Sequence, residues 1–258
     1  MSLLATKDLT VRFGGHVAVN AVTCAFEPGT LTAIVGPNGA GKTTYFNLIS
    51  GQLKASAGQV TLDGRDLSGM SASTRTRAGL GRAFQLTNLF PRLTVLENIR
   101  LAVQATRTGH HRHGLNLWSI WSDHCELTAR ADEILTAVAL AEKENELVAN
   151  LPHGDQRKLE VALLMALEPQ VFMFDEPTAG MSVLEAPVIL NLIRKLKEDK
   201  SKTILLVEHK MDVVRELADR IIVLHNGALV ADGEPADVIA SPIVQEAYLG
   251  VAQPAAVQ

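Results

Sequence analysis

The residues from position 36 to 44 constrain this chain more than any other segment. They match the spacing G-x-x-x-x-G-K-[ST], in which glycines let successive backbone N–H groups converge on nucleotide phosphates. The apolar run 31–35 predicts a buried strand, and a helix is expected from Thr44 onward, with its positive dipole end toward the phosphates. A chance glycine turn would not explain strand, loop, Lys-Thr pair and helix in this order. The chain is therefore expected to bind ATP or GTP.

Each residue of this loop is a candidate nucleotide contact. Lys42 carries a mobile positive charge for the terminal phosphates, and the Thr43 hydroxyl is a candidate ligand of Mg²⁺. The candidate phosphate-binding residues are Gly36, Pro37, Asn38, Gly39, Ala40, Gly41, Lys42, Thr43 and Thr44.

Composition narrows the class of protein and its partners. The 258 residues are 47% hydrophobic, and 24 Lys and Arg against 28 Asp and Glu give a net charge of −4. This balance offers no basic footprint for nucleic acid, so no nucleic acid partner is expected. No uninterrupted apolar run approaches the roughly 20 residues that span a bilayer, and the first residues do not resemble a signal peptide. Cys24 and Cys125 lack metal-ligand spacing and are expected to be reduced thiols of a cytosolic protein. Any link to a membrane should come through a partner.

The order of predicted elements indicates a composite α/β domain. Strands are predicted at 9–13, 17–26 and 59–64, in the first part of the chain. Helices are predicted at 94–103, where Thr94 and Glu97 form an S/T-x-x-E capping pattern, and at 126–139, with a loop over 106–122. After Pro152, helices alternate with strands predicted at 171–174, 203–207 and 220–224. Such alternation predicts a parallel sheet.

Polar residues follow the predicted strands. Asp175 and Glu176 end the third-last of them, where Asp175 can hold Mg²⁺ and Glu176 can orient or deprotonate the attacking water. Alone, this pair could equally be a solvated acidic turn; beside a phosphate loop, the catalytic interpretation is favoured. His209 follows the next strand and can donate to a γ-phosphate oxygen, and Gln85 can reach both the metal and the water. A single His or Gln would indicate nothing without these neighbours.

Together these segments resemble the ATP-binding subunits of ABC transporters, over nearly the whole chain. The resemblance implies that Phe13 stacks on adenine, that Gln85 is the Q-loop glutamine, and that His209 is the switch histidine. It implies magnesium and catalytic roles for Asp175 and Glu176, so that the metal ligands are Thr43, Gln85 and Asp175. Residues 151–157 fall at the position of the LSGGQ signature, where Gly154 would contact a nucleotide. The loop before Glu126, the run 155–160 and the ending 233–250 look most like branched-chain amino acid importers.

The signature departs from the common form of the family. Pro152 stands where the family has a serine that donates to the γ-phosphate in the opposite subunit, and Asp155 replaces the usual Gln. We expect Asp155 to turn aside, toward ribose or its own backbone. Ser182 falls where the family often has Asp. Two interpretations stay open: tolerated variation within a subfamily, or a weaker half of a composite ATP site.

The resemblance implies an α/β fold of the P-loop ABC ATPase type, with a parallel core sheet and an N-terminal antiparallel β-subdomain. The domain is expected to span 1–250, with a helical subdomain inserted at about 87–160 and a disordered tail at 251–258. A histidine-rich stretch, His110, His111 and His113, could bind a transition metal, but its Gly and Arg neighbours favour a solvated segment.

The family implies ATP and Mg²⁺ as cofactors and a larger assembly as the setting. The partners are a second ABC ATPase subunit in a homo- or heterodimer, two transmembrane permease subunits and, indirectly, a solute-binding protein. The chain would then be peripheral, on the cytoplasmic face of the inner membrane. The alternatives are a soluble ABC ATPase outside transport and a weakly hydrolysing regulatory subunit. The sequence does not identify the transported solute, because solute specificity resides in the other subunits of such a transporter.

Overall fold

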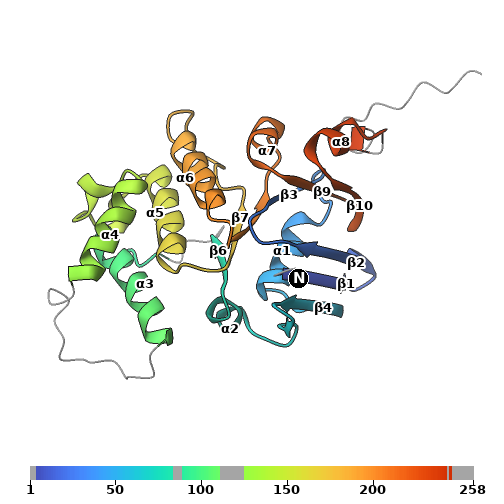
Figure 1. The fold of residues 1–258 in the computed structure, drawn as a ribbon, viewed down its shortest axis with the longest axis horizontal. Helices are drawn as coiled ribbons and strands as arrows, with labels where there is room; N and C mark the ends of the chain where they lie inside the picture. Colours follow the sequence, from blue (N-terminus) through green and yellow to red (C-terminus); the bar gives the residue numbers. More distant parts are fainter. Residues whose placement is uncertain (1–3, 84–88, 111–124, 243, 246–258) are drawn as a thin grey trace, which may run out of the picture.

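The computed structural model describes residues 4–83, 89–110, 125–242, 244 and 245. Two sheets lie at one end of the molecule and a group of helices at the other (Figure 1). This arrangement agrees with the predicted fold class.

A six-stranded sheet forms the centre of the fold. Its strand order is β10-β9-β3-β8-β7-β6, and every pairing is parallel except that of β10 with β9. The predicted parallel sheet is therefore confirmed. The strands are β3 (Leu31–Val35), β6 (Leu80–Ala83), β7 (Val171–Asp175), β8 (Thr203–Val207), β9 (Arg220–His225) and β10 (Ala228–Gly233).

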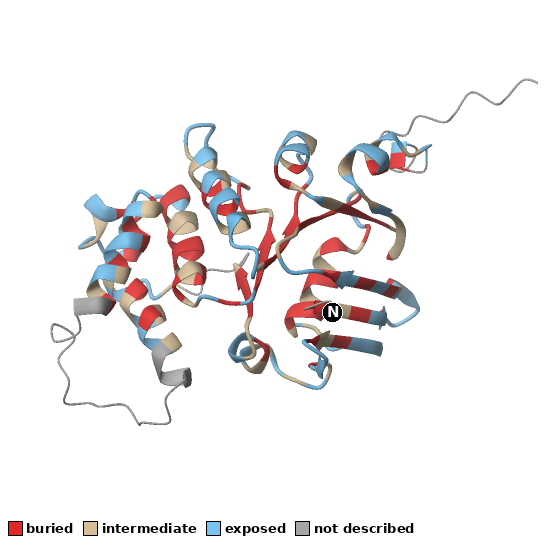
Figure 2. Cartoon of the chain, in the orientation of Figure 1, coloured by how far each residue is buried: buried red, intermediate tan, exposed pale blue. Residues whose placement is uncertain are grey.

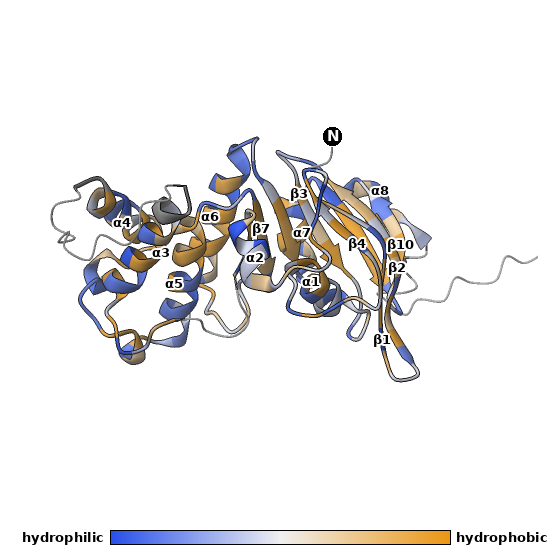
Figure 3. Cartoon of the chain, turned by 90° about the horizontal axis from the view of Figure 1, so that it is seen from below, coloured by the Kyte–Doolittle hydropathy of each residue, from blue (hydrophilic) through white to orange (hydrophobic). Residues whose placement is uncertain are grey.

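Helices cover both faces of this sheet, which explains the continuous apolar sequence of its central strands. Every residue of β3, β7 and β8 is buried (Figure 2). Alternate residues of β7 belong to different cores: Met173 packs in the cluster that contains Phe46 of α1 (Lys42–Ser50), and Phe174 packs in the cluster that contains Ile189 of α6 (Ala186–Glu198). Figure 3 shows the hydrophobic residues, in orange, concentrated on the strands between the helices.

A second, antiparallel sheet packs on the other side of α1. Its order is β2-β1-β4-β5, and it confirms the strands predicted in the first part of the chain. Tyr45 of α1 is fully buried in this layer, and its hydroxyl lies 2.8 Å from Thr6 Oγ1. The strands are β1 (Leu4–Phe13), β2 (His16–Phe26), β4 (Ala57–Leu62) and β5 (Arg65–Asp66).

Three helices, α3 (Val95–His110), α4 (Cys125–Ala137) and α5 (His153–Ala166), form the group at the far end, and two 3₁₀ turns, Ala141–Lys143 and Val148–Asn150, lie between the last two. Their buried residues, including Ile99, Ile134 and Leu159, join the same core as Phe174. The remaining helices are α2 (Ala72–Arg77), α7 (Met211–Leu217) and α8 (Pro235–Ala240).

One predicted boundary was wrong. The loop expected from Thr106 begins later, because α3 continues to His110. Thr106 supports the longer helix: its hydroxyl donates to the Ala102 carbonyl 3.1 Å away within α3 and to the Ala166 carbonyl 3.0 Å away at the end of α5. Most of the predicted loop, including His111 and His113, lies outside the described residues, as does the predicted tail 251–258.

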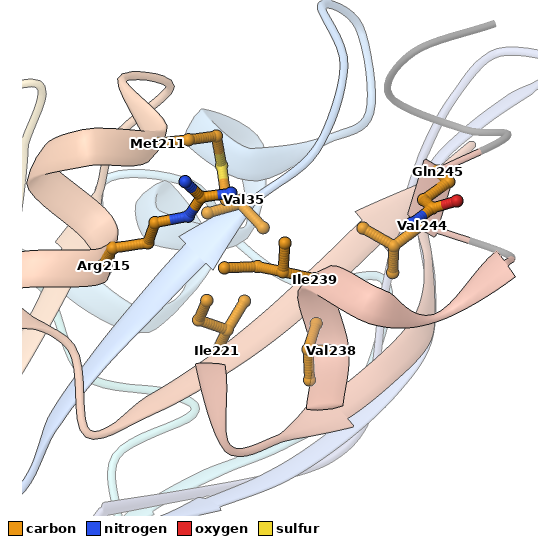
Figure 4. A pocket seen from close by; sticks show the side chains of 8 residues that line it. All are labelled: Val35, Met211, Arg215, Ile221, Val238, Ile239, Val244 and Gln245. Carbon is orange, nitrogen blue, oxygen red and sulfur yellow. The ribbon is translucent and has the colours of Figure 1, made fainter. Parts of the chain in front are cut away.

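A third apolar cluster lies between α7, β9 and α8. It surrounds an open cavity of about 100 Å³, with Val35, Ile221 and Val238 in its lining and Arg215 and Gln245 as its polar neighbours (Figure 4). Within the parts of the chain that the structure describes, no helix combines the length and the apolar character needed to cross a bilayer.

The capping pattern at the start of α3 gives a test of local stability. The Thr94 N–H donates to Glu97 Oε2 at 2.7 Å, and the Glu97 N–H donates to Thr94 Oγ1 at 3.1 Å, so both halves of the predicted capping box are formed. Thr94→Ala removes the hydroxyl acceptor and should lower the free energy of unfolding by about 0.5–2 kcal/mol in chemical denaturation. Thr94→Ser keeps the hydroxyl and is the control; equal stability of the two variants would contradict a capping role.

Candidate nucleotide-binding and hydrolysis site

The loop between β3 and α1 needs glycine at two of its positions. Gly36 and Gly41 have φ values of 152° and 95°, which residues with a side chain rarely adopt. A Cβ atom on Gly36 would lie 2.2 Å from the Leu224 carbonyl oxygen, and one on Gly41 would lie 2.5 Å from the Ala18 carbonyl oxygen. The loop therefore packs backbone against backbone on β9 and β2, which fixes its course.

An open cavity of about 290 Å³ lies over this loop. The structure brings seven of the predicted phosphate-binding residues to its wall, together with Glu176. Gly36 and Pro37 are not in the lining, and their carbonyl oxygens accept from Lys42 Nζ. His16 and Ala18, which were not predicted from the sequence, complete the lining from β2. The loop residues in the lining are Asn38, Gly39, Ala40, Gly41, Lys42, Thr43 and Thr44.

Phe13 lies at the end of β1, and its partner on β2 is a residue of the cavity wall. It pairs with His16 across the β1–β2 turn, and His16 lines the cavity. Phe13 is 51% exposed, so it is not a core residue.

Lys42 is folded back onto its own loop. Its Nζ donates to the Gly36 carbonyl at 2.6 Å and to the Pro37 carbonyl at 2.9 Å. Burial lowers the pKa of Lys42, while the nearby carboxylates Glu176 and Asp175 act in the opposite direction. The ammonium is therefore held at the loop by its two carbonyl acceptors.

The two predicted carboxylates at the end of β7 have different surroundings. Asp175 is buried, and burial raises its pKa, although its ion pair with Arg82 opposes the shift. Glu176 adopts a φ of 48° and donates its N–H to the Val207 carbonyl at 2.9 Å. Its side chain is partly exposed and lines the cavity. Glu176 is thus the carboxylate accessible from the cavity, and Asp175 is the enclosed one.

His209 follows β8 and faces Glu176. Its Nδ1 lies 3.7 Å from Glu176 Oε1 and 3.8 Å from Glu208 Oε1. Glu208 is buried, and its Oε1 accepts the backbone N–H groups of His209 and Lys210 at 3.2 and 3.1 Å, which fixes the turn. The structure therefore gathers Lys42, Glu176 and His209 at one edge of the sheet.

The residues at this edge fit a magnesium ion. Asp175 does not line the cavity, but its Oδ1 is buried and has no hydrogen-bond partner among the described residues, which leaves one oxygen for a metal or its water. Thr43 lies in the wall of the cavity. A hydroxyl, one carboxylate and phosphate oxygens are an ordinary oxygen environment for Mg²⁺. The third predicted ligand, Gln85, lies outside the described residues, just beyond the end of β6.

The signature segment begins α5. Pro152 is the residue at its N-cap and gives no side-chain hydrogen bond, so the first turn lacks a cap. Asp155 was expected to face ribose or its own backbone; instead, it pairs with Lys143 and Lys158 at 2.6 and 2.8 Å. Burial alone would raise the pKa of Asp155, but these two ammonium groups lower it overall. The predicted orientation of Asp155 was wrong because the folded chain brings two lysine ammonium groups within reach of its carboxylate.

Gly154 lies in the first turn of α5 and does not line the chain's own nucleotide cavity. A Cβ atom there would lie 2.1 Å from Glu185 Oε1, so the Glu185 side chain would have to move to admit one. Glu185 is held by Ser182, whose hydroxyl donates to Oε2 at 2.7 Å and whose N–H donates to the same oxygen at 3.0 Å. Ser182 is thereby a local support for Glu185.

The comparisons with known proteins agree with this geometry. A profile of the family described as ABC transporter matches residues 19–179. The high-affinity branched-chain amino acid transport ATP-binding protein LivG of Salmonella typhimurium is 39% identical over 251 residues, covering 97% of this chain and 98% of LivG.

Solved structures show the same fold. A nucleotide-free ATP-binding cassette from an ABC transporter superposes with a TM-score of 0.80 at 29% identity, covering 97% of this chain and all of that one. A dimeric post-hydrolysis state of the cassette MJ0796, bound to ADP and Pi, gives a TM-score of 0.76 at 27% identity, covering 90% and 98%. The profile match, the near full-length identity and the phosphate loop with its facing carboxylates lead to one conclusion: this chain belongs to the ABC transporter family and is one of its ATP-hydrolysing cassettes.

Proposed function

We propose that this cassette hydrolyses ATP to drive the import of branched-chain or other hydrophobic amino acids. The solute assignment is supported by the near full-length similarity to LivG, whose name specifies branched-chain amino acid transport. The observation that supports hydrolysis by this chain is Glu176: it lines the cavity of the phosphate loop and lies 3.7 Å from the His209 ring.

In the proposed ground state, the loop and Phe13 hold the nucleotide. Backbone N–H groups at the start of α1 and the Lys42 ammonium bind the β- and γ-phosphates, and the exposed Phe13 ring stacks on the base. Besides its two carbonyl acceptors, the Lys42 ammonium has a third N–H donor, which would take a phosphate oxygen. Thr43, Asp175 and Gln85 are the proposed ligands of Mg²⁺. When bound, the ion supplies neutralisation of the negative charge on the β- and γ-phosphates.

In the proposed hydrolytic step, Glu176 accepts a proton from the water that attacks the γ-phosphorus. His209, whose Nδ1 lies 3.7 Å from Glu176 Oε1, would orient Glu176 and donate to a γ-phosphate oxygen. Gln85 would help to position the water. The bond between the γ-phosphorus and the bridging oxygen breaks, and ADP leaves with the electron pair.

The proposed assembly is a head-to-tail dimer of cassettes beneath two permease subunits. Gly154 and the start of α5 would face the nucleotide of the second cassette, which agrees with their position outside the chain's own cavity. The dimeric cassette MJ0796 supports this arrangement. A peripheral position on the cytoplasmic face of the inner membrane follows from the permeases, and a solute-binding protein would deliver the amino acid to them.

Glu176→Gln tests the catalytic assignment. The amide keeps the size of the side chain but cannot accept the proton, so hydrolysis should slow by at least about a hundredfold, the scale of a lost general base. Nucleotide affinity should remain within about twofold, since Glu176 is not assigned a binding role. Phosphate release and nucleotide titration measure the two effects. Glu198→Gln, an exposed substitution at the end of α6, is the control. Near-normal turnover of Glu176→Gln would remove Glu176 from this role.

Phe13→Ala tests the adenine contact. Loss of the ring should weaken ATP binding by about 1–2 kcal/mol, the scale of one aromatic ring stacked on a base. Turnover at saturating ATP should change little, because Phe13 is remote from the proposed reacting atoms. Phe90→Ala is the matched control, since Phe90 is similarly exposed at 54% and does not line the nucleotide cavity. Equal affinities of the two variants for ATP would reject the stacking assignment.

A further inference from the structure

Arg82 is a buried charge that the proposed mechanism does not use. It lies on β6, and only 6% of the residue is exposed. Burial lowers the pKa of its guanidinium, which the neighbouring Asp175 opposes. A guanidinium is costly to bury unless its donors are matched, so the partners of Arg82 indicate its task.

One side of the guanidinium binds Asp175. Nη2 of Arg82 donates to Asp175 Oδ2 at 2.7 Å, and the side chains of Arg82 and Asp175 are 4% and 0% exposed. The other carboxylate oxygen, Oδ1, is buried and has no partner among the described residues. Arg82 therefore occupies one oxygen and leaves the second available.

The other side of the guanidinium is fixed to α1 and the turn that follows it. The two N–H donors of Nη1 lie within hydrogen-bond distance of three acceptors, Asn47 Oδ1 at 2.6 Å, Ser50 Oγ at 3.0 Å and Gln52 Oε1 at 3.0 Å. The Nε of Arg82 is buried and has no hydrogen-bond partner among the described residues. The guanidinium carbon also lies 5.4 Å from the centre of the Phe46 ring. Phe46 and Ser50 are buried, Asn47 is half-buried and Gln52 is exposed, so the planar group is held mainly by its enclosed neighbours.

We propose that Arg82 is a positioning residue for the magnesium site. It holds Asp175 in the orientation that presents Oδ1 to the ion, and it sets the separation between β7, which carries Asp175, and α1, which begins beside Thr43. The inference rests on the proposed role of Asp175 as a metal ligand. The competing interpretation is a purely structural pair that anchors β6 to α1.

Two substitutions of Arg82 separate these interpretations. Arg82→Lys keeps the charge but loses the forked donors, and Arg82→Gln removes the charge. ADP affinity is measured by calorimetry in EDTA and across a Mg²⁺ series, and phosphate release is measured across the same series. In both variants, the Mg²⁺ concentration that gives half of the maximal gain in ADP affinity, or half of the maximal rate of phosphate release, should rise by about tenfold or more. This is the usual result of removing the support of a metal ligand. ADP affinity in EDTA should change less than about twofold, because the phosphate loop is untouched.

Arg75 provides the matched control. It is also a buried arginine, 3% exposed, and its Nη1 donates at 2.7 Å to the Leu48 and Ile49 carbonyls at the end of the same helix. The guanidinium of Arg75 donates only to backbone carbonyls among the described residues, and none of them belongs to Asp175. Arg75→Gln should therefore lower the unfolding temperature without raising the Mg²⁺ requirement. If Arg75→Gln and Arg82→Gln raise the Mg²⁺ requirement equally, the role of Arg82 is purely structural and the proposal is overturned.

Asp175→Asn distinguishes the failure of this inference from the failure of the proposed function. If Asp175→Asn leaves the Mg²⁺ requirement unchanged, the assignment of Asp175 as a ligand is wrong. If Asp175→Asn raises the requirement and Arg82→Lys does not, only the role of Arg82 is wrong. Because Arg82 is proposed to act through Asp175, adding Arg82→Lys to Asp175→Asn should raise the requirement by less than about twofold further. If the double variant instead raises the Mg²⁺ requirement by the product of the two single effects, the proposal is overturned.

If Arg82→Gln does not fold, Asn47→Ala replaces it. Asn47→Ala removes one support of the guanidinium and should shift the Mg²⁺ requirement in the same direction.

Discussion

The site depends on the register of three neighbouring parallel strands. Val207 of β8 pairs with Ile34 of β3 on one side and with Asp175 of β7 on the other, so the strands end at the same level. Because parallel strands place their carboxyl ends together, the phosphate loop, the carboxylate pair and His209 emerge at one edge. A shift of one residue in either pairing would turn the side chains to opposite faces and separate these groups.

Charges inside and outside the core have different roles in this cassette. The pair of Arg82 with Asp175 is fully enclosed, and removal of one partner from such a pair commonly costs about 3–5 kcal/mol because the other remains buried. Asp155 with Lys143 and Lys158 lies nearer the surface, where water and salt weaken each contact. The enclosed pair belongs to the hydrolytic edge, and the outer group belongs to the start of α5, on the side proposed to face the second cassette.

The sequence predicted most of this arrangement because its main signals are local. The buried strands, the phosphate loop and the Thr94 capping box depend on residues close together in the chain. Arg82 was missed because its carboxylate partner is 93 positions away, and nothing in its neighbours indicates burial. The pairing of Asp155 with Lys158 is a helical i,i+3 contact, but Lys143 reaches it from a separate turn. The end of α3 was misplaced because Thr106 is stabilised by a carbonyl of α5.

The hydrogen bonds of Lys42 have a consequence for how the loop presents its charge. The ammonium donates to two carbonyl oxygens of its own loop, at 2.6 and 2.9 Å, and has a third N–H donor for a phosphate oxygen. Because the two bonds already fix the long side chain, little of its rotamer freedom remains to be lost when a phosphate takes the third donor. A di- or triphosphate adds contacts with the backbone N–H groups along the loop. The lysine is thus pre-organised by its own loop, so that the charge and the backbone donors face the same chain of phosphates.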